Sequence, residues 1–190
     1  MREGYHVILD QYRPHAVWFG HNAYGIHGIE HVTRVLIWAD HLVQWAVATG
    51  QPVDGEVVHW AAVLHDVGRK NDDRDPEHGP RSARWIDGHR ELLPPALTQS
   101  QLDAIQYCCI WHVPADRLTP MMTPELLCLK DADAVDRVRI GDLNPAMLRT
   151  SYSRKLIDPA ARLCQVGEID AGPDPWQRIR KAALTLGLWR

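Results

Sequence analysis

Apolar residues recur along this chain at the 3.6-residue period of an α-helix, and no stretch alternates convincingly with the two-residue period of a strand. The pattern is clearest over residues 29–49, which we expect to form one helix that ends before Gly50 and Pro52. A second, mostly buried helix is predicted over residues 54–66, with Gly68 just past its end. Pro and Gly therefore divide the chain into segments of helical length.

Residues that typically begin helices extend this prediction to the rest of the chain. A short helix is expected over about 78–87, and a Thr and a Gln three residues apart form a capping box that opens a helix over about 98–112. A Thr-Pro-Glu sequence opens another over about 123–140. One or two further helices are expected over 145–190, whereas residues 1–26 show no clear pattern. The predicted fold class is an all-α bundle of unequal helices.

Length and charge narrow the possible classes. A chain of 190 residues has one domain by default, and we expect a single domain over residues 1–190. Its 45% hydrophobic content suffices for one sizeable core. The formal net charge of −3 disfavours duplex nucleic acid as a partner, because such binding surfaces are strongly basic. No window approaches the 18 apolar residues of a membrane span, so no membrane contact is expected.

The N-terminus and the cysteines bear on localisation. Residues 1–6 lack the charged-then-apolar pattern of a signal peptide. The chain has four cysteines with no C-x-x-C pair, and the two adjacent ones would not normally bridge each other. This usage is typical of buried thiols in a reduced compartment, so we expect a cytoplasmic protein.

Polar residues interrupt three of the predicted helices, and the chain contains 11 His. His27 and His31 lie where the first helix begins, His65–Asp66 closes an apolar helix, and acids interrupt the segment 129–136. Each interruption alone is explained by a satisfied core histidine or a capping carboxylate. Three on separate helices, each offering imidazole or carboxylate groups, indicate that they converge, and this mixed donor set suits a transition metal or Mg.

These motifs in this order resemble the H…HD…D signature of the HD-domain phosphohydrolase superfamily, over about residues 26–140. His27-Gly-x-x-His31-Val resembles the first motif, Leu-His65-Asp66-Val-Gly the second, and Asp-Ala-Asp133-Ala-Val-Asp the last. The family is all-α, in agreement with the helical pattern. The resemblance implies that His31, His65, Asp66 and Asp133 bind a metal, with Asp131 as the alternative last ligand or a neighbour of it.

Two further segments resemble parts of the same family. His78-Gly-Pro-Arg-Ser-Ala and the segment that ends at His112 correspond to sequences whose histidines, in members that have both, hold a second metal or contact the scissile phosphate. The alternatives are a loop histidine and a histidine at a helix end. Arg69, three residues after Asp66, is placed to reach a phosphate, although it is equally well explained as a solvent-exposed cation of a loop.

The resemblance implies a catalytic mechanism and a class of substrate. A divalent metal, as one or two ions of Mn, Fe, Ni, Mg or Zn, would activate water, and Asp66 would orient that water. His78 or His112 would bind a second ion or protonate the leaving oxygen. The expected partner is a small phosphorylated, nucleotide-like substrate, cleaved at a phosphomonoester, phosphodiester or pyrophosphate bond.

Other interpretations stay open at this point. The sequence from Gly68 to Asp75, together with the pair His27 and His31, also resembles the phosphodiesterase domain of bacterial SidE-type effectors. That resemblance implies metal-independent cleavage of an ADP-ribosyl phosphodiester, with His27 as an acid or base. A degenerate HD domain that binds a nucleotide or a protein without turnover is a further alternative. The H-x-x-E-H pattern ending at His31 matches inverted zinc proteases, but three fixed positions arise easily by chance.

Overall fold

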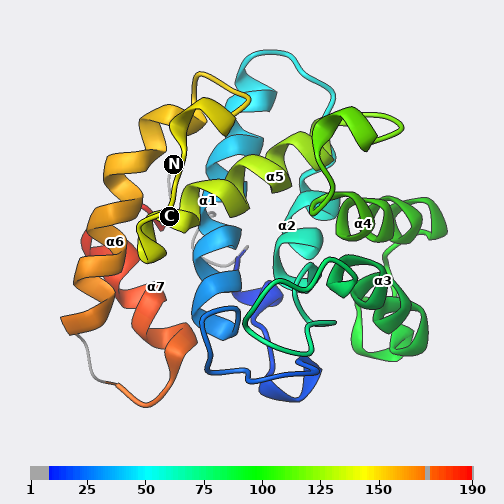
Figure 1. Ribbon diagram of the computed structural model, residues 1–190, viewed down its shortest axis with the longest axis horizontal. Coiled ribbons are helices and arrows are strands. Elements are labelled where there is room, and N and C mark those ends of the chain that lie inside the picture. Colours follow the sequence, from blue (N-terminus) through cyan, green and yellow to red (C-terminus); the bar gives the residue numbers. More distant parts are fainter. Residues whose placement is uncertain (1–8, 170–171, 190) are drawn as a thin grey trace.

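Every regular element in the described part of the chain is helical, which confirms the all-α prediction (Figure 1). The computed structural model describes residues 9–169 and 172–189, so residues 1–6, predicted to carry no signal peptide, lie outside it. Seven α-helices lie in these residues: α1 (Ile29–Ala48), α2 (Gly55–Leu64), α3 (His78–Gly88), α4 (Gln99–Trp111), α5 (Pro124–Asp136), α6 (Ile157–Ile169) and α7 (Pro175–Thr185). None of them combines the length and apolar character needed to cross a membrane.

Capping side chains begin helices α2, α4 and α5, and two of these caps are the predicted threonines. At the start of α4, Thr98 Oγ1 accepts from the Gln101 N–H while the Gln101 side chain accepts from the Thr98 N–H, as a capping box requires. Thr123 accepts from the Leu126 N–H at the start of α5, and Asp54 caps α2. Each such cap contributes roughly 1 kcal/mol to stability, because it satisfies backbone donors that the helix leaves unpaired.

Two helices end earlier than the pattern predicts. Helix α5 ends at Asp136 and continues as a 3₁₀-helix, Arg137–Ile140, which Gly141 closes with a φ of 71°. The tighter 3₁₀ turn accounts for the helical periodicity that extends to residue 140. Helix α2 ends at Leu64 because the chain turns directly after it, where the Arg69 N–H donates to the Asp66 carbonyl.

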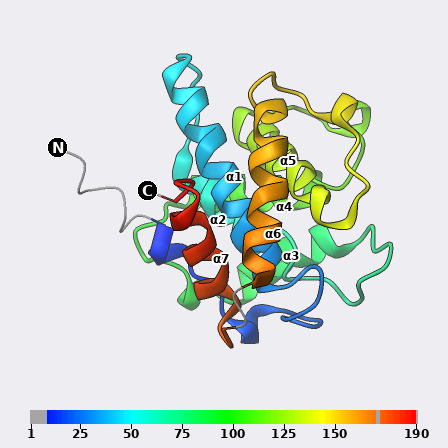
Figure 2. The same cartoon turned by 90° about the vertical axis from the view of Figure 1, so that its left-hand side faces the viewer.

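Helix α1 lies at the centre of the bundle, where it contacts α2, α5 and α7. Helices α3 and α4 pack against each other beyond α2 and form the right-hand side of the molecule in Figure 1. Helices α6 and α7 lie on the opposite side, and Figure 2 shows them from outside, in front of α1. The central position of α1 lets it present residues to elements on both sides.

The core holds the segments that carry the polar motifs. Along α1, Val35, Leu36 and Trp38 are fully buried, and in α2 both Val63 and Leu64 are. Full burial of one such side chain stabilises the fold by about 1.5–3 kcal/mol. The first turn of α1 and the turn after α2 are therefore held in fixed positions by close packing on either side of them.

Candidate metal centre

Three segments far apart in the sequence bring their polar side chains together between α1, α2 and α5. His31 lies in the first turn of α1, His65 directly follows α2, and Asp133 lies in α5. His31 Nε2 is 3.3 Å from His65 Nε2 and 3.5 Å from Asp133 Oδ1. One ligand atom from each of the three lies within 4.8 Å of the other two. Both histidines are buried and the carboxylate is half-buried, so the group has one side open to solvent.

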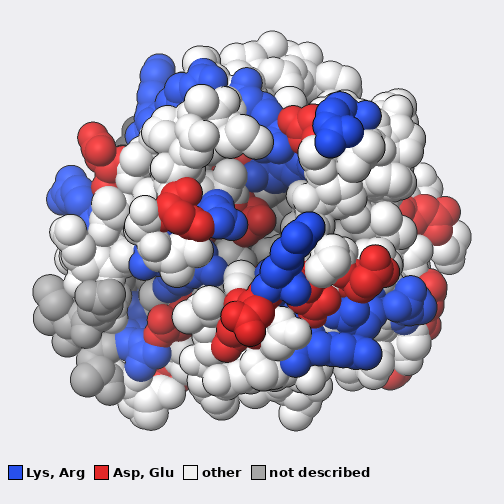
Figure 3. All heavy atoms as spheres, in the orientation of Figure 1, with Lys and Arg blue, Asp and Glu red and all other residues white. Residues whose placement is uncertain are grey.

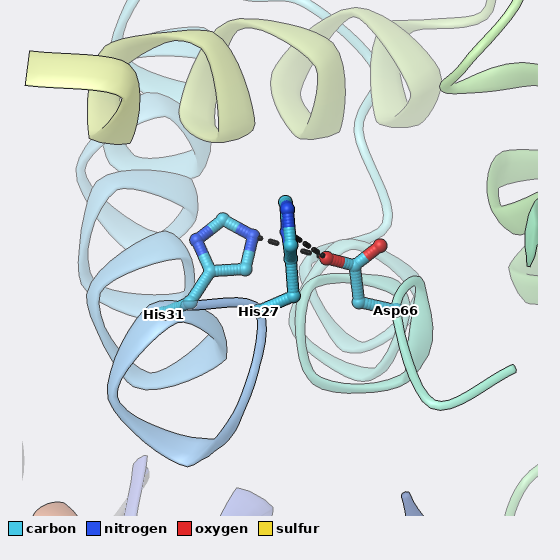
Figure 4. A group of neighbouring side chains, drawn as sticks. All are labelled: His27, His31 and Asp66. Atoms are coloured by element: carbon cyan, nitrogen blue, oxygen red, sulfur yellow. Dashed lines mark hydrogen bonds and ion pairs between the residues drawn. The ribbon is translucent and has the colours of Figure 1, made fainter. Parts of the chain in front are cut away.

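Asp66 contacts different partners with its two carboxylate oxygens. Its Oδ2 lies 3.0 Å from His27 Nδ1 and 3.4 Å from His31 Nε2, and Figure 4 shows both rings directed at this oxygen. Its Oδ1 lies 3.0 Å from His78 Nε2 and 3.1 Å from Arg69 Nε. This buried carboxylate therefore joins the histidines of α1 to the histidine of α3. Burial raises the pKa of Asp66, but His65 and the other three histidines outweigh it and lower the pKa well below its usual value.

The two histidines from the later motifs form a pair beside Asp66. His78 begins α3 and His112 directly follows α4, and their Nε2 atoms are 2.8 Å apart. The ring of His112 also packs edge-on against that of His65, with ring centroids 5.0 Å apart. The four buried histidines thus form one continuous cluster, with Asp66 at its centre.

Three of these rings are fixed by the same local contact. His65, His78 and His112 each donate Nδ1–H to the backbone carbonyl three residues earlier, at 2.8, 2.5 and 2.6 Å respectively. Since a carbonyl oxygen only accepts, the neutral rings carry their proton on Nδ1. Their Nε2 atoms therefore present lone pairs to the cluster, which is how the inner hydrogen bond of a metal-binding histidine orients the ring.

The fourth ring is fixed by a carboxylate instead. His31 Nδ1 donates to Asp136 Oδ2 at 2.8 Å, and Arg34 Nε donates to Asp136 Oδ1 at 2.7 Å. Burial raises the pKa of Asp136, but Arg34 and His31 outweigh it and lower the pKa to about 2. Asp136 is therefore ionised and accepts both bonds. Sequence reasoning gave Asp136 no role, although its place three residues after Asp133 puts both on one face of α5.

These donors fit a bound divalent cation. In the His78–His112 pair, the Nε2 lone pairs of the two neutral rings face each other at 2.8 Å, and His31 Nε2 lies 3.3 Å from the Nε2 lone pair of His65. A cation relieves that repulsion. Protonation of two of the rings is unfavourable, because burial lowers the pKa of His65 and lowers that of His112 to about 3. A divalent metal ion, which neutral imidazoles and ionised carboxylates bind, fits this set of side chains.

The two candidate acids of α5 face different ways. Asp131 is buried, and its carboxylate accepts from the backbone N–H groups of Arg149 and Thr150, each at 2.9 Å. It holds the segment after α5 in place. Asp133, two residues along the helix, faces the histidines. The structure thus places Asp133, the favoured residue of the two, at the candidate site.

Two glycines allow close backbone approaches, Gly68 between the turn after α2 and α3, and Gly79 between α3 and α4. A Cβ on Gly68 would lie 2.4 Å from Ser82 N, and one on Gly79 would lie 2.3 Å from Cys109 O. Ser82 reinforces the first approach, because its hydroxyl donates to the His65 carbonyl at 2.7 Å and accepts from the Gly68 N–H at 2.9 Å. Close backbone packing therefore brings the α3 and α4 histidines next to His65 and Asp66.

A cavity of about 390 Å³ opens onto the cluster. Val113, Leu143 and Met147 give it an apolar wall. Most of the other lining residues are histidines or charged, and acidic and basic side chains are interspersed around the middle of the face drawn in Figure 3. The basic lining residues are Arg69, Lys130, Arg137, Arg139 and Arg149, of which the sequence pointed only to the first. The others come from α5 and the segment after it, and nothing in their spacing distinguishes them from surface cations.

All the residues singled out in the sequence for this site lie together in the structure: His27, His31, His65, Asp66, Arg69, His78, His112 and Asp133. A family model described as the HD domain matches residues 28–138, more than half of the 190-residue chain. Every one of those eight residues except His27 falls within the match. A search of the curated proteins and a search of the solved structures each found no significant match.

Proposed function

The chain belongs to the HD domain family, whose members are mostly phosphohydrolases, and from this premise we propose that it is a metal-dependent phosphohydrolase. The proposed substrate is a small, nucleotide-like phosphate compound, cleaved at a phosphomonoester, phosphodiester or pyrophosphate bond. The observation that carries the proposal is the convergence of four buried imidazole Nε2 atoms around Asp66. At His65, His78 and His112 the Nε2 atom carries a buried lone pair, which a bound cation satisfies.

The proposed ligands are those implied by the motifs. They are His31, His65, Asp66 and Asp133 for one ion, with Asp66, His78 and His112 available to a second. When bound, a divalent ion supplies Lewis acidity toward a phosphoryl oxygen and lowers the pKa of a coordinated water. Four protein donors leave open positions only on an ion that accepts five or six ligands, which favours Mn, Fe, Ni or Mg over tetrahedral Zn.

His112 and His27 differ in how deeply they are buried, and this separates their roles in the proposal. His112 has a pKa lowered to about 3 by burial, with further lowering by His65, so it is neutral at pH 7 and suited to donate a lone pair. His27 lies at the edge of the cluster, its side chain 17% exposed, with Nδ1 held by Asp66. His27 lines the cavity beside Asp66, where it helps to orient that carboxylate from the edge of the cluster.

The cations of the cavity supply the substrate contacts in this proposal. Arg69 lies directly beside Asp66, and Lys130 and Arg149 contact Asp116 at the outer edge. Guanidinium groups grip phosphate oxygens in a bidentate manner and neutralise their charge. A volume of about 390 Å³ with an apolar wall suits a small organic phosphate.

One observation favours a second candidate function, a metal-independent phosphodiesterase. The contact of 3.0 Å between His27 Nδ1 and Asp66 Oδ2 is a carboxylate–imidazole pair of the kind that performs general acid–base catalysis. In that mechanism His27 moves the proton and Asp66 orients its ring. The other histidines then have no cation to bind, which is why we prefer the metal-dependent function.

A substrate panel tests the proposal. The purified protein is assayed for phosphate release and for diester cleavage with nucleotides and small phosphate esters, each with Mn, Mg, Ni, Fe or Zn added and each with a chelator. We expect hydrolysis that a chelator abolishes and that one of these metals restores. Hydrolysis that survives the chelator supports the second candidate instead.

A further inference from the structure

A second cavity, of about 460 Å³, lies on the other side of Arg34 and Arg139 from the metal centre. It is enclosed by the start of α1, the 3₁₀-helix after α5, and helices α6 and α7. Its volume lies within the range of small-molecule binding sites. Arg139 lines both cavities, but none of the histidines or acids of the metal centre lines this one. Whatever it binds is therefore separate from the proposed substrate.

Three arginines gather at the polar side of this second cavity. Arg34 is 6% exposed; its Nε and Nη2 donate to Asp136, whereas Nη1 lies 3.6 Å from Glu30 Oε2, beyond hydrogen-bond distance. Arg178 pairs with the other oxygen of Glu30, and Arg139 donates to the backbone carbonyl of Ile26 at 2.9 Å. Glu30, the one carboxylate among the described residues that line the cavity, thus pairs with Arg178 and lies near Arg34. Asp136 behind them pairs with Arg34 and Arg139. A buried cation with an incompletely paired nitrogen attracts an anionic group.

The rim of the same cavity is apolar. Tyr24, Ile26 and Ile140 line it and are 72%, 48% and 43% exposed. Large apolar side chains that surround a pocket mark a ligand site when they lie together. Ile179, which is buried, closes the inner end. The cavity therefore combines a cationic floor with an apolar entrance.

From these two features we propose that this cavity is a second ligand site, which takes a small organic anion with an apolar body. The anionic group pairs with Arg178 and with Nη1 of Arg34, and the apolar body lies against Tyr24 and Ile140. The site stands independently of the proposed phosphohydrolase function, because it uses none of the proposed metal ligands.

Cys164 provides a direct measure of occupancy. It lines this cavity and is half-buried, whereas the other three cysteines are buried. The probe is 8-anilino-1-naphthalenesulfonate, which has a sulfonate and an aromatic body. The rate of Cys164 alkylation by N-ethylmaleimide is followed by mass spectrometry in its presence. At ten times the probe's Kd we expect alkylation to slow by about tenfold, since only unoccupied protein reacts.

Matched controls test the two chemical requirements. Arg178→Gln removes one cation of the floor and is expected to raise the probe's Kd by about tenfold or more. Arg180→Gln, on the same helix, alters an arginine that contacts Asp10 and Trp189 instead, and it is expected to leave the Kd unchanged. The uncharged analogue N-phenyl-1-naphthylamine should protect Cys164 less well than the sulfonate. An unprotected Cys164, protection that Arg178→Gln retains in full, or equal protection by the neutral analogue overturns the proposal.

Discussion

The buried carboxylate of Asp136 holds His31 in the tautomer that the metal centre requires. Asp136 Oδ2 accepts from His31 Nδ1–H at 2.8 Å, while Arg34 holds the other oxygen at 2.7 Å. His31 Nε2 therefore faces His65, Asp66 and the open side of the cluster. A carboxylate behind a ligating imidazole fixes the ring and increases its basicity.

Asp136→Asn should weaken metal binding by about 10- to 100-fold, because the amide no longer orients His31 as firmly or supplies its negative charge. It should also destabilise the protein, since Arg34 loses its buried counter-ion, at a cost of up to about 3–5 kcal/mol. Calorimetric titration with Mn²⁺ measures the first effect, and urea unfolding of the metal-free protein measures the second.

Asp131→Asn is the matched control on the same helix. Asp131 is equally buried but binds the backbone at Arg149 and Thr150, away from the histidines. We expect lower stability with an unchanged number of bound ions. If Asp131→Asn lowers metal affinity as much as Asp136→Asn does, the role assigned to Asp136 is wrong.

Gly79→Ala should disturb the pairing of His78 with His112. The added Cβ meets the Cys109 carbonyl at 2.3 Å, so α3 must move away from α4, at a cost of about 1–3 kcal/mol. Gly88→Ala lies in the same helix with nothing within 4 Å and should be neutral or slightly stabilising. Thermal unfolding and metal content of the two variants are compared. Equal behaviour of the two would contradict the close approach described for Gly79.

The metal-free protein should lose stability as the pH falls below about 6.5. Burial, with His65, lowers the pKa of His112 to about 3 in the folded state, whereas the unfolded chain takes up that proton near pH 6.5. The unfolded state therefore binds more protons between these values, and stability declines as the pH falls through them.

Comparison with His112→Asn isolates this contribution. His31 acts in the opposite sense, because hydrogen bonds to Asp136 and Asp66 raise its pKa against the effects of burial and Arg139. Urea midpoints of both metal-free proteins at pH 7.5, 6.5 and 5.5 should show a shallower decline for the variant. The same slope in both proteins would mean that His112 is not held neutral.

His27→Ala separates the two candidate mechanisms. In the metal-dependent mechanism His27 contributes from the edge of the cluster, so its loss should reduce kcat modestly and leave the metal content unchanged. In the metal-independent mechanism it moves the proton, and its loss should reduce kcat by about 10²- to 10⁴-fold. The measurement is kcat for the variant with metal and with a chelator. A severe defect in chelated protein would favour the second candidate.

The fold was predictable because its signals are local. The period of apolar residues and the caps at Thr98 and Thr123 depend on neighbours within a few residues, and the structure confirms those helix starts. The ends of α2 and α5 were placed too late, because the chain turns directly after Leu64 and a 3₁₀-helix follows Asp136.

The candidate site was only partly predictable. The histidines and acids occur in three motifs, so their convergence followed from the residues and the family resemblance. The cavity cations Lys130 and Arg149 could not be identified, because their position depends on how the segment after α5 folds back on Asp131 and Asp116. Asp136 was visible as a residue, but its bond to His31 is a tertiary contact between α5 and α1.

The most direct test of the account is the metal content of the protein purified without chelator, together with that of His65→Ala. The account predicts one or two divalent transition-metal or magnesium ions per chain by elemental analysis. It also predicts loss of the ion and of metal-stimulated hydrolysis in the variant, whose helical circular dichroism remains. A wild-type protein that holds no metal, binds none on titration and gains no hydrolysis with any of the five metals would contradict the central claim.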